Sequence, residues 1–212
     1  MSKAINKTLA SYRWQLKSLL HLLLLCPLFY CVLAVVNGWW GGDPVQAIIH
    51  YLANSALNIL LITLCLAPVS RKFKLPSLLG YRRLIGLYVF VYALLHLAAY
   101  LVIDLGLDWQ LFWQENIQRP YIWLGMIAFV VLLAMSITSL KALQQKLGRR
   151  WLQLHGLVYP ITLLVLVHFW WSLKSGWLEP VLYLVVVAGL FSLRKLQIQR
   201  WLSSFNNTSH SK

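Results

Sequence analysis

Charged side chains are scarce in this chain, and acidic ones are the scarcest. Of its 212 residues, 11% are charged, whereas a soluble domain carries roughly 25%. Only five residues are Asp or Glu, and none of them lies in the middle of a long apolar run. Because 60% of the residues are hydrophobic, the composition excludes an ordinary soluble domain and indicates a membrane protein.

Familiar sequence signatures of enzymes are also absent. The sequence has no phosphate-binding loop, no strand-linked G-x-G-x-x-G, no H-E-x-x-H and no CxxC pair. We interpret the three cysteines, Cys26, Cys31 and Cys65, as small buried residues of apolar segments. We therefore predict no catalytic residue in the strict sense, and any chemistry must come from other polar groups.

Long apolar runs are what the chain does have. Each approaches the roughly 20 residues that a helix needs to cross about 30 Å of hydrocarbon, and lipid leaves the helix as the only plausible state for such a run. We predict an all-α, polytopic membrane bundle that forms a single domain over 1–212. Its six transmembrane helices are expected at about 16–36, 47–69, 84–103, 121–140, 152–173 and 178–196.

The net charge of +14 has to be interpreted by position. All but two of the 19 Lys and Arg residues lie in the two tails and in the loops after the second and fourth runs. The other side has Arg119, Lys174 and all five acids. Because Lys and Arg collect in cytoplasmic loops, we predict that both termini are cytoplasmic (N-in/C-in), and we exclude nucleic-acid binding.

Five of the six histidines lie in or beside the apolar runs. A single histidine in a span would be best explained by a packing role, but several together indicate a function. His96 lies eight residues before Asp104, and His168 lies six before Lys174, which puts both roughly 9–12 Å below the outer boundary. Two imidazoles at one depth on parallel helices could ligate one haem iron from opposite faces.

The other histidines fall at the membrane margins. His155 precedes His168 by 13 residues, or about 20 Å of helix, so one helix presents a histidine near each face. This geometry permits two haems without requiring them. His21 lies near the cytoplasmic level of His155, and His50 opens the second run on the outer side. For both, a haem, propionate or quinone contact competes with a purely structural role.

Four segments carry a family resemblance over about 12–200. The chain resembles the haem-binding membrane subunits of bacterial periplasmic methionine sulfoxide reductase systems, within the ferric-reductase-like transmembrane group. The segments are RRLIGLYVFVYALLHLAAY (82–100), RPYIWLG (119–125), TSLKALQQKLGRRWLQLHGLVY (138–159) and HFWWSLK (168–174).

The resemblance implies b-type haem on His96, His155 and His168, in a protein of the bacterial inner membrane. It also implies electrons that enter from quinol or the cytoplasmic side. They would leave to a periplasmic molybdopterin partner, on which sulfoxide reduction itself occurs. FMN is a further cofactor associated with the family, and no residue of the sequence locates it.

The chain departs from the larger relatives of this group in two respects. Those relatives place two histidines on each of two helices, whereas Arg83 stands 13 residues before His96 here. They also append a flavin and nicotinamide domain, and we expect none in cis here because only 197–212 follow the sixth run. Electrons would then come from quinol or from a separate cytoplasmic flavoprotein.

The sequence therefore predicts the electron-transfer subunit of an oxidoreductase, with one or two haems b. Four arginines could pair with haem propionates or contact quinone, since guanidinium binds carboxylates in bidentate geometry. They serve equally well as topology signals. These arginines are Arg82, Arg83, Arg149 and Arg150. The outer loop 104–119, which holds three acids, is a candidate docking surface, while its tryptophans are typical of an aromatic belt. The alternatives are a haem-free proton-coupled transporter, disfavoured because no helix centre has an acid, and a membrane anchor for a partner.

Overall fold

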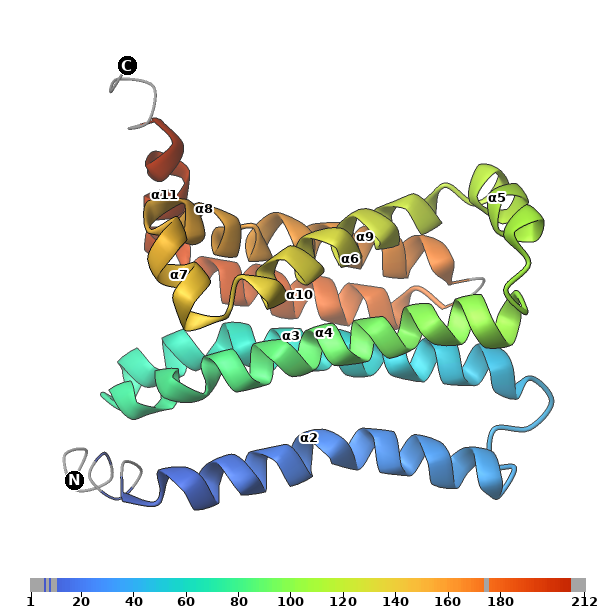
Figure 1. Ribbon diagram of the computed structural model, residues 1–212, viewed down its shortest axis with the longest axis horizontal. Coiled ribbons are helices and arrows are strands. Elements are labelled where there is room, and N and C mark those ends of the chain that lie inside the picture. The colour runs from blue at the N-terminus through green and yellow to red at the C-terminus, as the bar shows by residue number, and fades with distance from the viewer. Residues whose placement is uncertain (1–5, 7, 9–10, 174–175, 207–212) are drawn as a thin grey trace. The chain divides into compact units, whose positions relative to one another are not determined.

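The computed structural model describes residues 6, 8, 11–173 and 176–206. These residues form helices joined by short turns, and no strand occurs among them. Lys174, which marked the outer boundary beyond His168, lies outside the described residues. The predicted all-α class is confirmed (Figure 1).

Four helical segments are long and apolar enough to cross a membrane by themselves. Two are the single helices α2 (Arg13–Val36) and α3 (Pro44–Lys72). The third segment, Pro76–Asp104, is made of the 3-10 helix η1 (Pro76–Tyr81), α4 (Arg82–Ala98) and the π-helix η2 (Ala99–Asp104). The fourth segment, Arg149–Ser172, is made of α8 (Arg149–Gly156) and α9 (Val158–Ser172).

Two further spans are shorter, and a sharp bend joins each of them to a neighbouring helix. The chain turns by 111° between α5 (Trp109–Gln118) and α6 (Tyr121–Ile137), and by 73° between α10 (Leu178–Leu193) and α11 (Lys195–Asn206). The 17 residues of α6 rise about 25 Å, close to the thickness of the hydrocarbon core. The structure therefore has four clear spans among the described residues, and six if each bent pair counts as one.

The observed helix bounds differ from the predicted ones mainly at the polar ends. Helix α3 begins at Pro44 because Asp43 caps it: the Asp43 carboxylate accepts a hydrogen bond of 3.1 Å from the Gln46 amide. The predicted run 84–103 ends in the π-helix, and 121–140 ends at Ile137, before the short helix α7 (Lys141–Leu147). Hydropathy finds the apolar centre of a span, whereas caps and breaks decide its ends.

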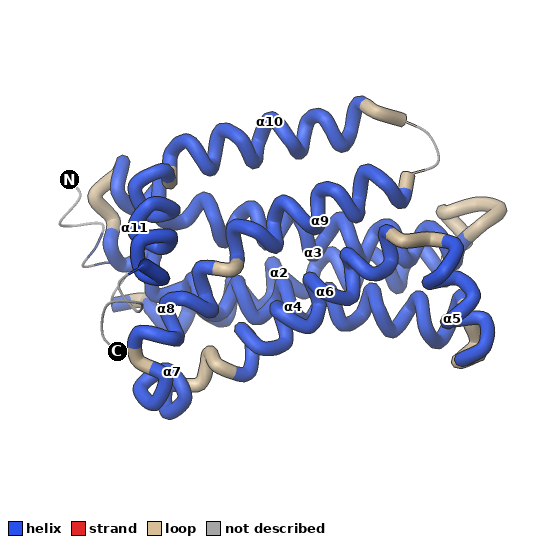
Figure 2. The backbone as a smooth tube through the Cα atoms, turned by 90° about the horizontal axis from the view of Figure 1, so that it is seen from above, coloured by secondary structure: helices blue, strands red, loops and turns tan. Residues whose placement is uncertain are grey.

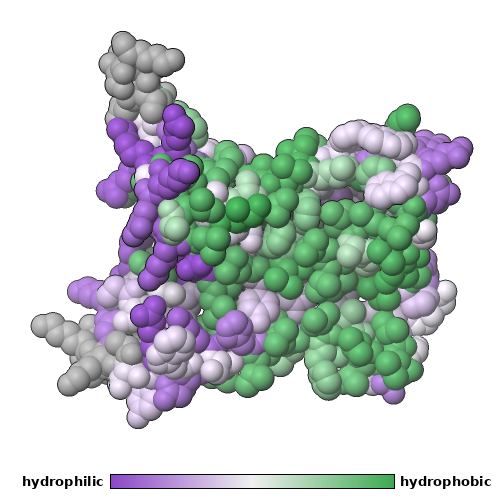
Figure 3. All heavy atoms as spheres, viewed as in Figure 1, coloured by the Kyte–Doolittle hydropathy of each residue, from purple (hydrophilic) through white to green (hydrophobic). Residues whose placement is uncertain are grey.

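The chain divides into two compact units, 1–115 and 116–212. The predicted single domain stays a prediction, and each unit is described by itself. In the first unit α3 packs along α4. In the second unit α9 packs against α6 and α10, and α11 packs against α8 (Figure 2). On the face that Figure 3 shows, apolar side chains cover the middle stretches of the helices and hydrophilic ones gather near their ends, as expected for membrane spans.

Helix α2 is tied to α4 through a tyrosine hydroxyl. Tyr92 is 1% exposed, and its hydroxyl accepts a 3.2 Å hydrogen bond from the Leu28 amide and donates one of 2.7 Å to the Leu24 carbonyl. These are the two groups that a regular helix joins to each other. Pro27 lies beside them, so the hydroxyl supports the backbone where the proline weakens it.

Candidate functional site

His96 is half-buried on α4, where a backbone carbonyl of α3 holds its ring. Its Nδ1 lies 3.0 Å from the carbonyl oxygen of Ile49. A carbonyl can only accept, so Nδ1–H donates, and the neutral imidazole keeps its lone pair on Nε2. A hydrogen bond of this kind fixes the tautomer and the orientation of metal-binding histidines.

His168 is held in the same way in the second unit. It lies half-buried on α9, and its Nδ1 is 2.7 Å from the carbonyl oxygen of Tyr121, the first residue of α6. The ring packs directly on Gly125: a Cβ added there would come within 2.8 Å of the His168 Cε1. Gly125 follows Tyr121 by one helical turn, so the missing side chain leaves the Tyr121 carbonyl open to the imidazole.

The two histidine arrangements repeat each other along the chain. In each, the imidazole donates to a carbonyl 47 positions earlier, and Ile49 and His96 precede Tyr121 and His168 by the same 72 positions. The residue one turn after Ile49 is Ala53, which is also small. Sequence reasoning identified both histidines but missed their acceptors, because a backbone carbonyl carries no residue-type signal.

His155 has the opposite ring arrangement. Its Nε2 lies 3.1 Å from the hydroxyl of Thr138, and that hydroxyl donates a 2.7 Å hydrogen bond to the Ala134 carbonyl. Thr138 therefore accepts from Nε2–H, which puts the lone pair of a neutral ring on Nδ1. The indole of Trp151 stacks on the imidazole at 4.2 Å and donates to the Thr138 carbonyl at 3.0 Å. No sequence pattern predicted this cluster of His155, Thr138 and Trp151.

His21 and His50 differ in their surroundings. His21 is exposed on α2, and its Nδ1 lies 2.8 Å from the hydroxyl of Tyr88 on α4, with the two rings in an edge arrangement at 5.6 Å. His50 is half-buried in the second turn of α3, next to the residue whose carbonyl holds His96. The structure thus brings His21 together with a second polar ring, whereas it sets His50 beside the backbone that positions another histidine.

The predicted arginines lie at helix starts. Arg82 and Arg83 are the first residues of α4, half-buried and exposed respectively, and Arg149 and Arg150 are exposed at the start of α8. Sequence reasoning treated Arg194 only as a topology signal. The structure buries it to 2% exposure between α10 and α11, with its guanidinium 5.4 Å from the centre of the Tyr159 ring.

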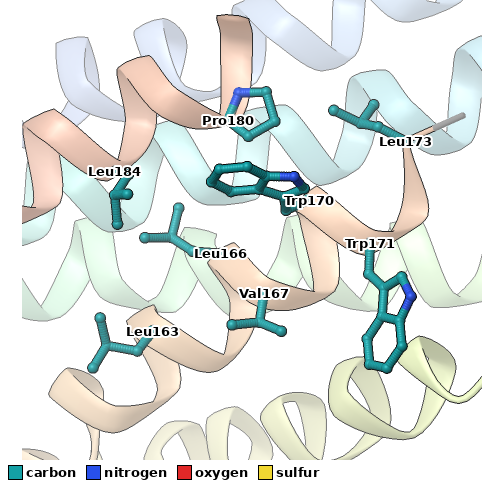
Figure 4. Close-up of a pocket in the computed structure, with 8 residues that line it drawn as sticks. All are labelled: Leu163, Leu166, Val167, Trp170, Trp171, Leu173, Pro180 and Leu184. Atoms are coloured by element: carbon teal, nitrogen blue, oxygen red, sulfur yellow. The ribbon is translucent and has the colours of Figure 1, made fainter. Parts of the chain in front are cut away.

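The described residues offer a cavity but no cluster of metal-binding side chains. They contain no group of three or more His, Cys, Asp or Glu side chains arranged to hold a metal ion. A cavity of about 480 Å³ lies between α9 and α10 (Figure 4). Its lining is apolar and includes none of the predicted site residues. The cavity is lined by Leu163, Leu166, Val167, Trp170, Trp171, Leu173, Pro180 and Leu184.

Comparison with known proteins defines the class to which this helical bundle belongs. Residues 51–166 match the family described as ferric reductase like transmembrane component. A Pectobacterium atrosepticum relative is 40% identical over 88% of this chain and 94% of its own length. A Klebsiella pneumoniae relative is 42% identical over 88% of this chain and 93% of its own length. No solved structure is significantly similar to the chain.

A third relative, from Pectobacterium carotovorum, is 40% identical over 88% of this chain and 94% of its own length, and all three have the same name. They are called protein-methionine-sulfoxide reductase heme-binding subunit MsrQ. This chain belongs to the MsrQ family of ferric reductase-like transmembrane proteins. The resemblance expected from its sequence segments is confirmed.

Proposed function

We propose that this chain is the electron-transfer subunit of a membrane oxidoreductase, and that His96 and His168 would together hold one haem b. The repeated histidine–carbonyl arrangement is the observation that carries this proposal. Both rings keep the Nε2 lone pair that iron needs. The name of the family's members, which describes them as haem-binding, supports the same assignment.

The protein residues fit haem by their chemistry. The Ile49 and Tyr121 carbonyls polarise the two imidazoles through Nδ1–H, which makes Nε2 a stronger donor and stops ring rotation. Gly125 keeps the space beside the His168 ring clear. Bound to these residues, haem would supply one-electron transfer within the bilayer.

The direction of transfer follows from the distribution of charge. With both termini cytoplasmic, His96 and His168 belong to the outer half of a bacterial inner membrane. We propose a periplasmic molybdopterin methionine sulfoxide reductase as the electron acceptor, on which oxidised envelope proteins are repaired. The name of the relatives supports a protein-methionine-sulfoxide reductase as the partner, while its periplasmic location and its molybdopterin are expected from the family resemblance. This chain would supply electrons without reducing the sulfoxide itself.

A second haem and FMN are the remaining cofactors in this proposal. His155 would bind or adjoin an inner haem. The four arginines at the starts of α4 and α8 would pair with propionates or serve as topology signals. FMN is expected from the family resemblance, and we assign it no residue.

Quinol is the electron donor that we propose, with a cytoplasmic flavoprotein as the alternative. The His21–Tyr88 pair supports quinol, because it puts a proton acceptor and a hydroxyl on the exposed surface of α2 and α4. Oxidation of one quinol releases two electrons and two protons, and an imidazole suits proton transfer near neutral pH. Vesicles that contain His21→Phe protein with full haem content should be reduced by dithionite but slowly by quinol. If the wild-type protein were reduced by reduced flavin but not by quinol, the cytoplasmic flavoprotein would be favoured as the donor.

The haem itself is tested by a dithionite-reduced minus oxidised spectrum and the pyridine haemochrome of purified protein. We expect a b-type signal that is lost in His96→Ala and in His168→Ala. His50→Ala is the matched control, since it also removes a half-buried imidazole from a span. Absence of haem from wild-type protein made with ample haem supply would instead favour the transporter or anchor.

A further inference from the structure

Helix α5 combines one buried side with two exposed stripes of different chemistry. It has ten residues, about 15 Å of rise, which is half of what a span needs. The Asp108 carboxylate starts the helix by accepting hydrogen bonds from the Gln110 and Leu111 amides at 2.8 and 3.0 Å. The buried side contains Phe112, 7% exposed, and Asn116, 1% exposed.

The first exposed stripe is wholly apolar. Trp109, Trp113 and Ile117 follow one another at four-residue spacing and are 62%, 56% and 79% exposed. Leu107, just before the helix, is 54% exposed and extends the apolar surface. Side chains at this spacing share one face of a helix, so the large apolar groups form a continuous apolar stripe.

The second exposed stripe is polar but uncharged. Gln110, Gln114 and Gln118 follow the apolar stripe at one-residue offset, and all three are exposed. One residue turns a helix by about 100°, so the glutamine stripe lies about 100° from the apolar stripe. Phe112 and Asn116 lie about 80° from the apolar stripe on its other side, opposite the glutamine stripe. The helix therefore presents three sectors, with the apolar stripe between the buried side and the glutamine stripe.

We propose that α5 lies in the plane of the membrane interface, with the apolar stripe inserted into the lipid boundary and the glutamine stripe facing water. A helix that rests on its own protein and on a bilayer surface has three environments, which correspond to the three sectors. The 111° turn between α5 and the span helix α6 gives α5 the direction of the membrane surface. Tryptophan is the residue type that favours this boundary.

Lipid is the occupant that the chemistry of the apolar stripe favours. No Lys, Arg, Asp or Glu stands in the apolar stripe, so it offers nothing to steer or register a protein partner. Insertion would also cover indole and aliphatic surface that water would otherwise contact. This proposal rests on the membrane spans and not on the proposed haem or its redox partners.

The test uses nitroxide labels on single cysteines in reconstituted vesicles. Ile117→Cys probes the apolar stripe and Gln114→Cys is the matched control on the glutamine stripe, both with Cys26, Cys31 and Cys65 replaced by alanine. Oxygen concentrates in hydrocarbon, whereas nickel-EDDA stays in water. We expect the ratio of oxygen to nickel collision rates to be several-fold higher at position 117 than at 114.

Two results would overturn the proposal. Equal nickel accessibility at both positions would put the apolar stripe in water, as a docking surface would be. Protection of position 117 from both reagents would mean that protein covers it. If the alanine background fails to fold, a membrane-impermeant maleimide on otherwise wild-type vesicles replaces the labels. Position 114 should then react at least several-fold faster than 117, and equal rates would refute the insertion.

Discussion

Replacing Gly125 by alanine should loosen the His168 side of the haem site. The new Cβ would lie 2.8 Å from Cε1, 3.1 Å from Nδ1 and 3.3 Å from Nε2 of the imidazole. Ordinary contacts begin near 3.4 Å, so the ring or α6 must retreat by about 0.6 Å. The retreat stretches or bends the 2.7 Å hydrogen bond to the Tyr121 carbonyl. It also turns Nε2 away from the direction in which it would meet the haem iron.

Overpacking of this kind costs about 1–3 kcal/mol. If the bound state carries that cost, haem affinity falls roughly 5- to 150-fold, at 1.4 kcal/mol per tenfold. The assay is the rate and extent of haem transfer from the purified protein to apomyoglobin. Faster and more complete transfer is the expected result.

Gly86→Ala is the matched control for this experiment. It also puts a Cβ on a span-helix glycine, yet its nearest neighbour, the Thr63 Cγ2, is 4.0 Å away. Haem retention should match that of the wild type. If Gly125→Ala retained haem as well as Gly86→Ala does, the close packing of His168 on α6 would have no part in holding the cofactor.

Three further substitutions test separate contacts. Tyr92→Phe removes the hydroxyl inserted into α2 and should destabilise the protein by about 1–3 kcal/mol, measured by thermal unfolding in detergent; an unchanged Tm would contradict this. Thr138→Val removes the acceptor of the His155 Nε2–H and should speed carbethoxylation of that histidine, measured by mass spectrometry, whereas an unchanged rate would mean that the hydroxyl does not hold the ring. Gly156→Ala would drive a Cβ into the Trp201 indole and should release α11 to trypsin, and unaltered digestion would show that α11 is held elsewhere.

The spans could be predicted because hydropathy adds up over many residues. The run 47–69 lies inside α3, and 16–36 lies inside α2. Their ends could not be predicted as well, since single groups such as the Asp43 cap decide them. Helices α5 and α11 were also missed, because both are short, polar-rich segments outside the long apolar runs.

The site was predictable as residues and not as contacts. His96 and His168 stand out because imidazoles are rare in apolar runs. The groups that hold them are main-chain carbonyls 47 positions away, which every residue possesses, so no pattern reveals them. The Thr138–His155 pair was missed for a related reason: a threonine at the end of a span is ordinary until a fold brings an imidazole to it.

The proposed electron transfer depends on His96 and His168 ligating one haem iron. The decisive measurement is electron paramagnetic resonance of the oxidised protein, in the wild type and in His96→Gly and His168→Gly. We expect a low-spin signal of two imidazole ligands that becomes high-spin or disappears in each variant, and that added imidazole restores in both. A low-spin signal that survives either substitution without added imidazole would show that other residues hold the iron, and would refute this ligand pair.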